Sequence, residues 1–420
     1  MKKKDTKVVN AWTFYDWANS VYNLVITATI FPIYYKAVTT DNISFLKLNF
    51  KNTELYDYAL AFAYLIIASI APLLSGIADY GGNKKKFMQF FCYLGGISCS
   101  MMYFFTSQNL WLGILLLILA CIGYSGSIVF YNAYLPEIAP PEEQDRVSAK
   151  GFAMGYAGSS ILLIFNLSMA IKPEWYGLTK AMAPRIAFLT VGIWWILFAQ
   201  IPFYFLPGGK KTKKNFDGSF LVKGYKELQK VWRELKHAKK LTRFLTAFFI
   251  YSMGVQTVML VATHFGAEEI KMKAEQLIVT ILIIQFIAIL GAYLFSRISK
   301  TKGNIFTLQL ATFVWAGICI AGYFIKTPNQ FYIIAFMVGL VMGGIQSLSR
   351  STYSKMLPET SDHASYFSFY DICEKISIVL GMALFGFING ASNSLRNPLL
   401  ALFVFFVVGF LLLIRVNRVN

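Results

Sequence analysis

Apolar stretches, each about 20 residues long, follow one another along the whole chain. A helix of roughly 20 apolar residues crosses the hydrocarbon core of a bilayer, which is about 30 Å thick. We therefore predict an all-α membrane protein with twelve transmembrane helices. The first six predicted helices cover residues 12–36, 57–79, 87–107, 110–134, 147–171 and 185–206, and the second six cover residues 242–264, 275–298, 304–325, 329–354, 365–389 and 397–416.

A long hydrophilic segment separates the two sets of helices. Its apolar residues recur at helical spacing and predict one basic, amphipathic helix: Leu221, Tyr225, Leu228, Trp232 and Leu235. We expect this helix to lie on the anionic surface of a membrane, with binding of a protein partner as the alternative. The predicted organisation is an N-terminal six-helix bundle (1–207), a basic linker (208–241) and a C-terminal six-helix bundle (242–420).

Composition and charge agree with a membrane protein. The chain is 56% hydrophobic and only 14% charged, which is too few polar side chains to cover a water-soluble globule. The net charge of +18 would suit nucleic acid, but most of the 39 Lys and Arg residues lie in the gaps on one side of the predicted membrane. The positive-inside rule then places both termini in the cytoplasm, and we expect no nucleic-acid partner. The basic start resembles a signal peptide, but the apolar segment after it is long and lacks a small-residue cleavage site, so we expect it to remain as the first helix.

The first predicted helix carries polar residues on one face. Asp16, Asn19, Asn23 and Thr27 follow one another at helical spacing. Polar side chains are costly in lipid, so this face should point into the bundle. We predict that it lines a pathway for substrate or protons; hydrogen bonding that only holds helices together is the alternative.

Two later helices carry charged residues, one helix near the middle of the membrane and the other near its cytoplasmic end. Asp371, Glu374 and Lys375 lie near the middle of helix 365–389, where ionisable groups are costly and mark functional sites. Asp371 and Lys375 are one turn apart and can form an ion pair, which leaves Glu374 for substrate recognition or coupled protonation. In helix 329–354, Gln346 and Arg350 share a face. We expect Arg350 to pair with Asp16 or Asp371 as a gate, or to reach the lipid headgroups.

The loop between the second and third helices, Ser75–Lys86, resembles the signature loop of the major facilitator superfamily. Asp79 ends a helix there and is followed by a turn with two glycines and a run of lysines, although Ser75 stands where that pattern has glycine. We expect Arg146, in the charged loop between the fourth and fifth helices, to be the gating partner of Asp79. An ordinary basic turn is the alternative reading of this loop.

Three further motifs, Trp12–Ser20, Phe130–Glu137 and Gly343–Ser351, resemble one branch of that superfamily. This branch contains the vacuolar amino-acid effluxers linked to autophagy and their bacterial relatives, and the resemblance extends over nearly the whole chain. It implies two six-helix bundles around a central cavity that opens to each side of the membrane in turn. For the eukaryotic members it also implies efflux of neutral amino acids.

These observations predict a secondary carrier in a bacterial inner (cytoplasmic) membrane. Its partners would be the lipid bilayer and a small polar or zwitterionic substrate, amino acids first, with transport either proton-coupled or facilitative and the protein acting as a monomer. Lys375 or Arg350 would meet a carboxylate, and an acidic residue would meet an amine or carry the proton. The alternatives are a carrier of an amphiphilic or lipid-like compound, a channel, and a receptor that does not transport. The three His and five Cys residues are scattered without catalytic or metal-binding spacing, so we expect no enzymatic activity, cofactor or metal.

Overall fold

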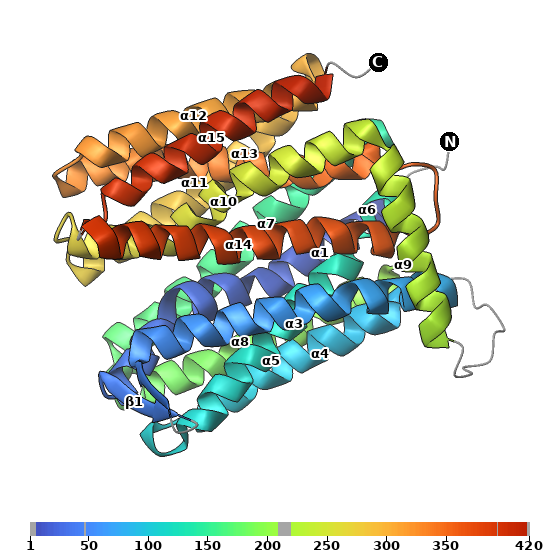
Figure 1. The fold of residues 1–420 in the computed structure, drawn as a ribbon. Coiled ribbons are helices and arrows are strands. Elements are labelled where there is room, and N and C mark those ends of the chain that lie inside the picture. Colours follow the sequence, from blue (N-terminus) through green and yellow to red (C-terminus); the bar gives the residue numbers. More distant parts are fainter. Residues whose placement is uncertain (1–5, 46–47, 209–219, 393, 418–420) are drawn as a thin grey trace.

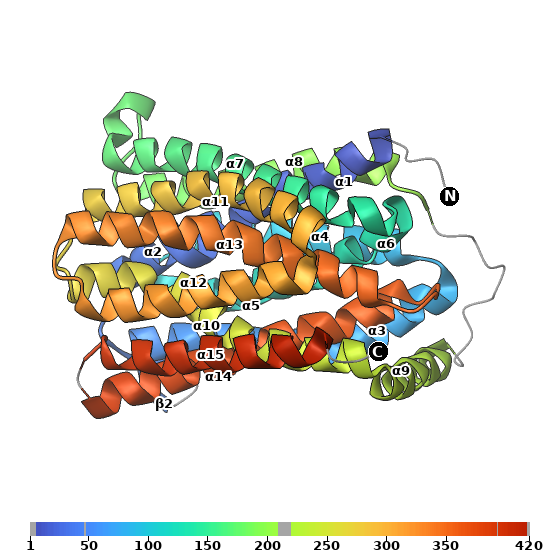
Figure 2. The same ribbon diagram turned by 90° about the horizontal axis from the view of Figure 1, so that it is seen from above.

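The computed structural model describes residues 6–45, 48–208, 220–392 and 394–417, and these form two six-helix halves (Figures 1 and 2). Eleven helices are long and apolar enough to cross a membrane, and α14 lies among them as the twelfth. The first half consists of one continuous helix with three segments, α1 (Thr6–Val21), η1 (Tyr22–Ile30) and α2 (Phe31–Val38), followed by α3 (Asn52–Gly81), α4 (Lys84–Met101), α5 (Leu110–Asn132), α7 (Pro141–Ile171) and α8 (Met182–Phe205). The second half consists of α10 (Lys239–Glu268), α11 (Ala274–Lys302), α12 (Asn304–Phe324), α13 (Pro328–Met356), α14 (His363–Ser392) and α15 (Asn397–Asn417).

Short elements mark the two ends of the molecule. The linker helix α9 (Phe220–His237) crosses the end at which α1 begins and α15 ends, which we call the linker end (Figure 1). A hairpin of β1 (Asn42–Phe45) and β2 (Leu48–Lys51) lies at the opposite end, called the hairpin end. The remaining short helices are η2 (Met102–Phe104), η3 (Ser107–Asn109), α6 (Leu135–Ile138) and η4 (Pro173–Tyr176).

Each predicted transmembrane helix is present, and several begin earlier than predicted. The fifth begins at Pro141 rather than at residue 147. Proline is well suited to the first turn of a helix, where its missing N–H is not needed, and acidic side chains there interact favourably with the helix dipole. Glu142 and Glu143 supply these charges. Of the segment that we predicted as a charged loop, residues 141–146 are therefore the first turns of α7, and residues 136–138 lie in the short helix α6.

The two halves contact each other along two seams. On one side α14 packs against α3, and on the other α7 packs against α11 and α13 (Figures 1 and 2). Residues far apart in the sequence thus meet near the middle of the bundle, which positions the site described below.

Glycine lets α11 and α13 approach each other closely. A Cβ atom at Gly291 would lie 2.0 Å from the carbonyl oxygen of Leu340. We expect Gly291→Ala to lower the free energy of unfolding by about 1–3 kcal/mol, because a backbone atom cannot move away as a side chain can. Thermal unfolding in detergent measures this. Gly386→Ala is the matched control, since a Cβ there meets nothing within 4 Å; equal losses in both variants would contradict the close packing.

The linker helix packs against the protein itself. Val231 and Leu235 are buried, whereas Tyr225 and Trp232 of the predicted apolar stripe are exposed. The predicted amphipathic helix is present, and its place on a membrane surface stays a prediction. The side chain of Leu221, also predicted for this stripe, lies outside the described residues. Lys230 of α9 forms an ion pair of 2.8 Å with Asp362, just before α14.

This attachment of α9 should depend on pH. Burial raises the pKa of Asp362, but hydrogen bonds with Lys230 and Glu227, together with the charge of Lys230, lower it by more than burial raises it. The pKa therefore lies below the ordinary value of 3.8. A carboxyl group with a lowered pKa stabilises the fold above its ordinary pKa and loses this contribution as pH falls through the lowered value. We expect hydrogen-exchange protection of residues 220–237, corrected for intrinsic rates, to persist near neutral pH and to fall below pH 3.8. Lys230→Ala should remove the pH-dependent part; an unchanged profile in that variant would contradict the role of the pair.

Candidate functional site

A cavity of about 230 Å³ lies between the two halves, near the middle of the bundle. Its wall combines aromatic, amide and charged side chains from helices of both halves. The polar and aromatic members are Asp16, Ser20, Asn23, Tyr64, Tyr124, Asn132, Phe152, Tyr156, Ser159, Phe248, Tyr251, Ser252, Gln256, Thr263, Gln285, Gln346, Ser349, Arg350, Tyr370, Glu374 and Lys375.

The predicted polar face of the first helix is split in the structure. Asp16 and Asn23 line the cavity, but Asn19 and Thr27 are buried away from it, so their prediction as lining residues is wrong. For Thr27 the reason is that residues 22–30 form a π-helix, whose wider turns shift the side chains within it. Ala28, five residues after Asn23, therefore lines the cavity in place of Thr27.

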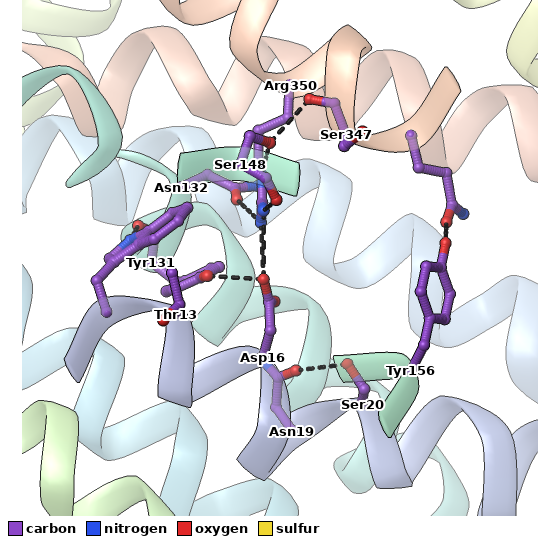
Figure 3. A network of polar contacts seen from close by, with 12 residues as sticks. Thr13, Asp16, Asn19, Ser20, Tyr131, Asn132, Ser148, Tyr156, Ser347 and Arg350 are labelled. Carbon is purple, nitrogen blue, oxygen red and sulfur yellow. Dashed lines mark hydrogen bonds and ion pairs between the residues drawn. The ribbon is translucent and has the colours of Figure 1, made fainter. Parts of the chain in front are cut away.

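An ion pair joins the halves on the linker side of the cavity (Figure 3). Arg350 of α13 reaches Asp16 of α1, with 3.2 Å between Nη2 and Oδ2. The hydroxyl of Tyr131 donates to the same Oδ2 at 2.7 Å. Both charged side chains are buried, so the structure brings Arg350 to Asp16 and not to Asp371 or the lipid headgroups.

The remaining atoms of the Arg350 guanidinium also make hydrogen bonds and a ring contact. Its Nε donates to Ser148 Oγ at 2.9 Å, and its Nη1 donates to Asn132 Oδ1 at 3.3 Å (Figure 3). The face of the group lies 4.2 Å from the ring centre of Phe152. Removing an arginine from water is costly unless its donors are satisfied and its charge is paired, and this cluster provides both.

A second charged cluster lies on α14. Lys375 Nζ is 3.4 Å from an oxygen of Asp371 and 3.4 Å from an oxygen of Glu374. The side-chain amide of Gln256 donates to Glu374 at 3.0 Å. Glu374 and Lys375 line the cavity, whereas Asp371 is buried one turn closer to the linker end and is not among the lining residues. The predicted pairing of Asp371 with Lys375 is present.

Gln346 connects the halves between these clusters. Its side-chain oxygen accepts a hydrogen bond from the hydroxyl of Tyr156 on α7 (Figure 3). This side chain was predicted to line the pathway, and the structure places it on the cavity wall.

Further polar contacts close the linker end. Asp79 accepts hydrogen bonds from the backbone N–H groups of Ala364 (3.3 Å) and Ser365 (2.7 Å), at the start of α14. A carboxylate suits this position because the first N–H groups of a helix have no partner within it. Arg146 was predicted to pair with Asp79, and this is wrong: Arg146 is exposed in the first turns of α7.

The residue next to Arg146 makes the contact between halves instead. Asp145 forms an ion pair with Lys355 at 2.6 Å and accepts a hydrogen bond from Asn304 at 2.8 Å. Glu137 contacts Lys84 within its own half and His363 of the other half, at 2.9 Å from the His363 Nδ1. The polar contacts between halves described here thus lie from the middle of the cavity to the linker end, which is closed in this conformation.

Sequence reasoning missed several residues of the site. Gln256 is polar in the middle of an apolar helix, the same signal that selected Asn23, and could have been found in this way. Asn132 and Ser148 lie near helix ends, where polar residues are common, and only the crossing of α5, α7 and α13 shows that they hold Arg350.

Comparison with known proteins agrees with this architecture. A family model described as "Vacuole effluxer Atg22 like" matches residues 4–144 and 139–420. The chain is 30% identical to the MFS-type transporter YxiO of Bacillus subtilis, over 98% of this chain and 95% of that protein. The chain belongs to the Atg22-like family of major facilitator transporters.

Solved structures and more distant relatives extend the comparison. Autophagy-related protein 22 of Yarrowia lipolytica is 26% identical, and the match covers 87% of this chain and 75% of the length of that protein. The transporter FucP in its outward conformation has a TM-score of 0.71 and 12% identity, covering 99% of each chain. The human organic anion transporter MFSD10 has a TM-score of 0.73 and 10% identity, covering 97% of this chain and 99% of its own. At these identities the two structures show the fold alone, with two six-helix bundles. The role of membrane transporter follows from the family.

Proposed function

We propose that this Atg22-like transporter is a secondary active carrier of a zwitterionic, amino-acid-like metabolite. The observation that supports the proposal is a cation and a carboxylate side by side on the cavity wall, Lys375 and Glu374. A zwitterion has one charge for each of them. Charges at membrane depth are costly, so their presence on a cavity wall favours a role in binding.

The proposed binding mode follows from the contacts of each group. Lys375 would bind the substrate carboxylate, and Glu374 would bind its amine together with Gln256, which already contacts Glu374. Asn23 and Gln346 on the cavity wall would supply neutral hydrogen bonds. The resemblance to vacuolar amino-acid effluxers supports the same substrate class.

We propose alternating access as the mode of transport. The polar contacts at the linker end would hold the described conformation, and their separation would open the cavity to that side. Arg350 with Asp16, and Asp79 with the start of α14, would act as parts of this gate. The basic linker end would face the cytoplasm by the positive-inside rule, in a bacterial inner membrane.

Counterflow in proteoliposomes tests this function. Vesicles loaded with one unlabelled amino acid should take up the same radiolabelled amino acid faster than empty vesicles, and the uptake should saturate. Testing each of the common amino acids singly identifies the substrate. A channel would give no saturation, and flux with none of the amino acids would refute the proposed substrate class.

A carrier of amphiphilic compounds is the second candidate. The apolar side chains along the cavity wall favour it: Leu24, Ile128, Phe152, Phe248, Val255, Val258, Met259, Ile281 and Val338. Such a substrate would compete with amino-acid counterflow or replace it. Measuring counterflow with a short-chain amphiphilic anion beside the amino acids separates the two candidates.

A further inference from the structure

We propose that Asp371 is the group that binds the coupling proton, and that it does so when the carboxylate of the substrate takes Lys375 away from it. This inference rests on the proposed function, because it requires a substrate with a carboxylate. It identifies Asp371, among the carboxyl groups of Asp16, Asp371 and Glu374, as the one that carries the proton. It also gives the reason why proton and substrate move together.

The three membrane-depth carboxyl groups of the two clusters differ in their hydrogen bonds. Asp16 accepts from Tyr131 and from two nitrogens of Arg350. Glu374 accepts from Gln256 and contacts Lys375. Asp371 is 2% exposed, and within the described part of the chain neither of its oxygens has a hydrogen-bond donor.

Asp371 therefore depends on one cation. Its ion pair with Lys375, at 3.4 Å, is the contact that compensates its charge. A buried carboxylate that loses its counter-ion is strongly unfavourable unless it gains a proton. The other charged or titratable groups near Asp371 and Lys375 are Glu374 and Cys373 on α14, Cys121 and Tyr124 on α5 and Tyr64 on α3.

The single ammonium group of Lys375 cannot compensate the carboxylate of Asp371 and the carboxylate of a bound substrate at the same time. Without substrate, Lys375 compensates Asp371. With substrate, Lys375 moves to the substrate carboxylate and Glu374 binds the substrate amine. A hydronium ion in the cavity then breaks one of its O–H bonds and becomes water, while its proton forms an O–H bond on Asp371. The proton returns to water when the substrate leaves and Lys375 pairs with Asp371 again.

The movement of the proton is therefore coupled to the movement of the substrate. The carrier avoids an uncompensated buried charge in two states, empty with the Asp371–Lys375 pair and loaded with both substrate and proton. One proton would then accompany each substrate molecule in the same direction.

Two assays on the same proteoliposomes test this. Wild-type protein should show counterflow of a radiolabelled amino acid and should also accumulate it when the side of entry is made acidic. Asp371→Asn should retain measurable counterflow, because its amide needs no counter-ion, but should lose accumulation and the substrate-induced proton uptake reported by a pH dye. Glu374→Gln should weaken counterflow itself, and Glu275→Gln, at an exposed position outside both clusters, should leave both assays unchanged.

Titration calorimetry supplies a measurement without a variant. Wild-type protein, titrated with the same amino acid in two buffers of different ionisation enthalpy, should take up about one proton per bound molecule. This decides the question if Asp371→Asn fails to fold. This inference is overturned, and the proposed function is kept, if the wild type shows counterflow and Asp371→Asn still accumulates the amino acid. The same holds if the wild type binds the amino acid without taking up a proton. Absence of wild-type counterflow with every amino acid overturns the proposed function and this inference with it.

Discussion

Arg350→Met should destabilise the protein more than any other single change discussed above. The substitution keeps an unbranched side chain of similar length but leaves the Asp16 carboxylate buried without its cation. Removing one member of a buried ion pair typically costs about 3–5 kcal/mol, because the remaining charge is uncompensated. The free energy of unfolding in detergent, or the melting temperature, measures this loss, and transport should fall with it.

Two controls separate the ion pair from the packing of the arginine. Asp16→Asn combined with Arg350→Met should recover part of the stability, since the double variant has no unpaired charge. Arg146→Met replaces an exposed arginine and should change stability by less than about 0.5 kcal/mol. If the double variant is no more stable than Arg350→Met, the loss comes from packing against Trp12 and Phe152 and not from charge.

The sequence predicts the helices of this protein better than the directions of its side chains. Apolar length locates eleven of the twelve helices in the described part of the chain, because hydrocarbon excludes unpaired backbone groups and leaves few alternatives. The twelfth, α14, is found when a few charges are tolerated within a span. The same cost identifies Asp16, Arg350 and Lys375 as inward-facing, since charges at such depth are rarely tolerated elsewhere. Their pairing follows from charge, but the choice of Asp16 over Asp371 as the partner of Arg350 depends on how α1 and α13 cross.

The errors at Thr27 and at Arg146 have two different physical origins. An apolar sequence such as residues 22–30 has the same composition in an α-helix and a π-helix, so helical spacing wrongly placed Thr27 beside Asn23. Arg146 was assigned to Asp79 from charge alone, whereas the unpaired N–H groups at the start of α14 satisfy that carboxylate. Backbone donors of a distant helix leave no pattern in the sequence near Asp79.

Lys375→Met should abolish measurable transport. This change removes the proposed partner of the substrate carboxylate and also leaves Asp371 and Glu374 without their shared cation. Loss of one partner of a buried, hydrogen-bonded charge pair costs about 2–5 kcal/mol of binding, and each 1.4 kcal/mol is a factor of ten. We therefore expect the substrate affinity, measured by titration calorimetry, to fall by at least about 30-fold.

Stability must be separated from binding in this variant, because the two unpaired carboxylates also disfavour the fold. Asp371→Asn combined with Lys375→Met removes one of the negative charges, so it should recover part of the lost stability but none of the substrate affinity. Lys300→Met, at an exposed position near the end of α11, should match the wild type in both measurements. A double variant that transports as well as the wild type would show that no carboxylate is bound at Lys375. The cavity would then serve a substrate recognised by its aromatic and apolar wall, in agreement with an amphiphilic compound rather than a zwitterion.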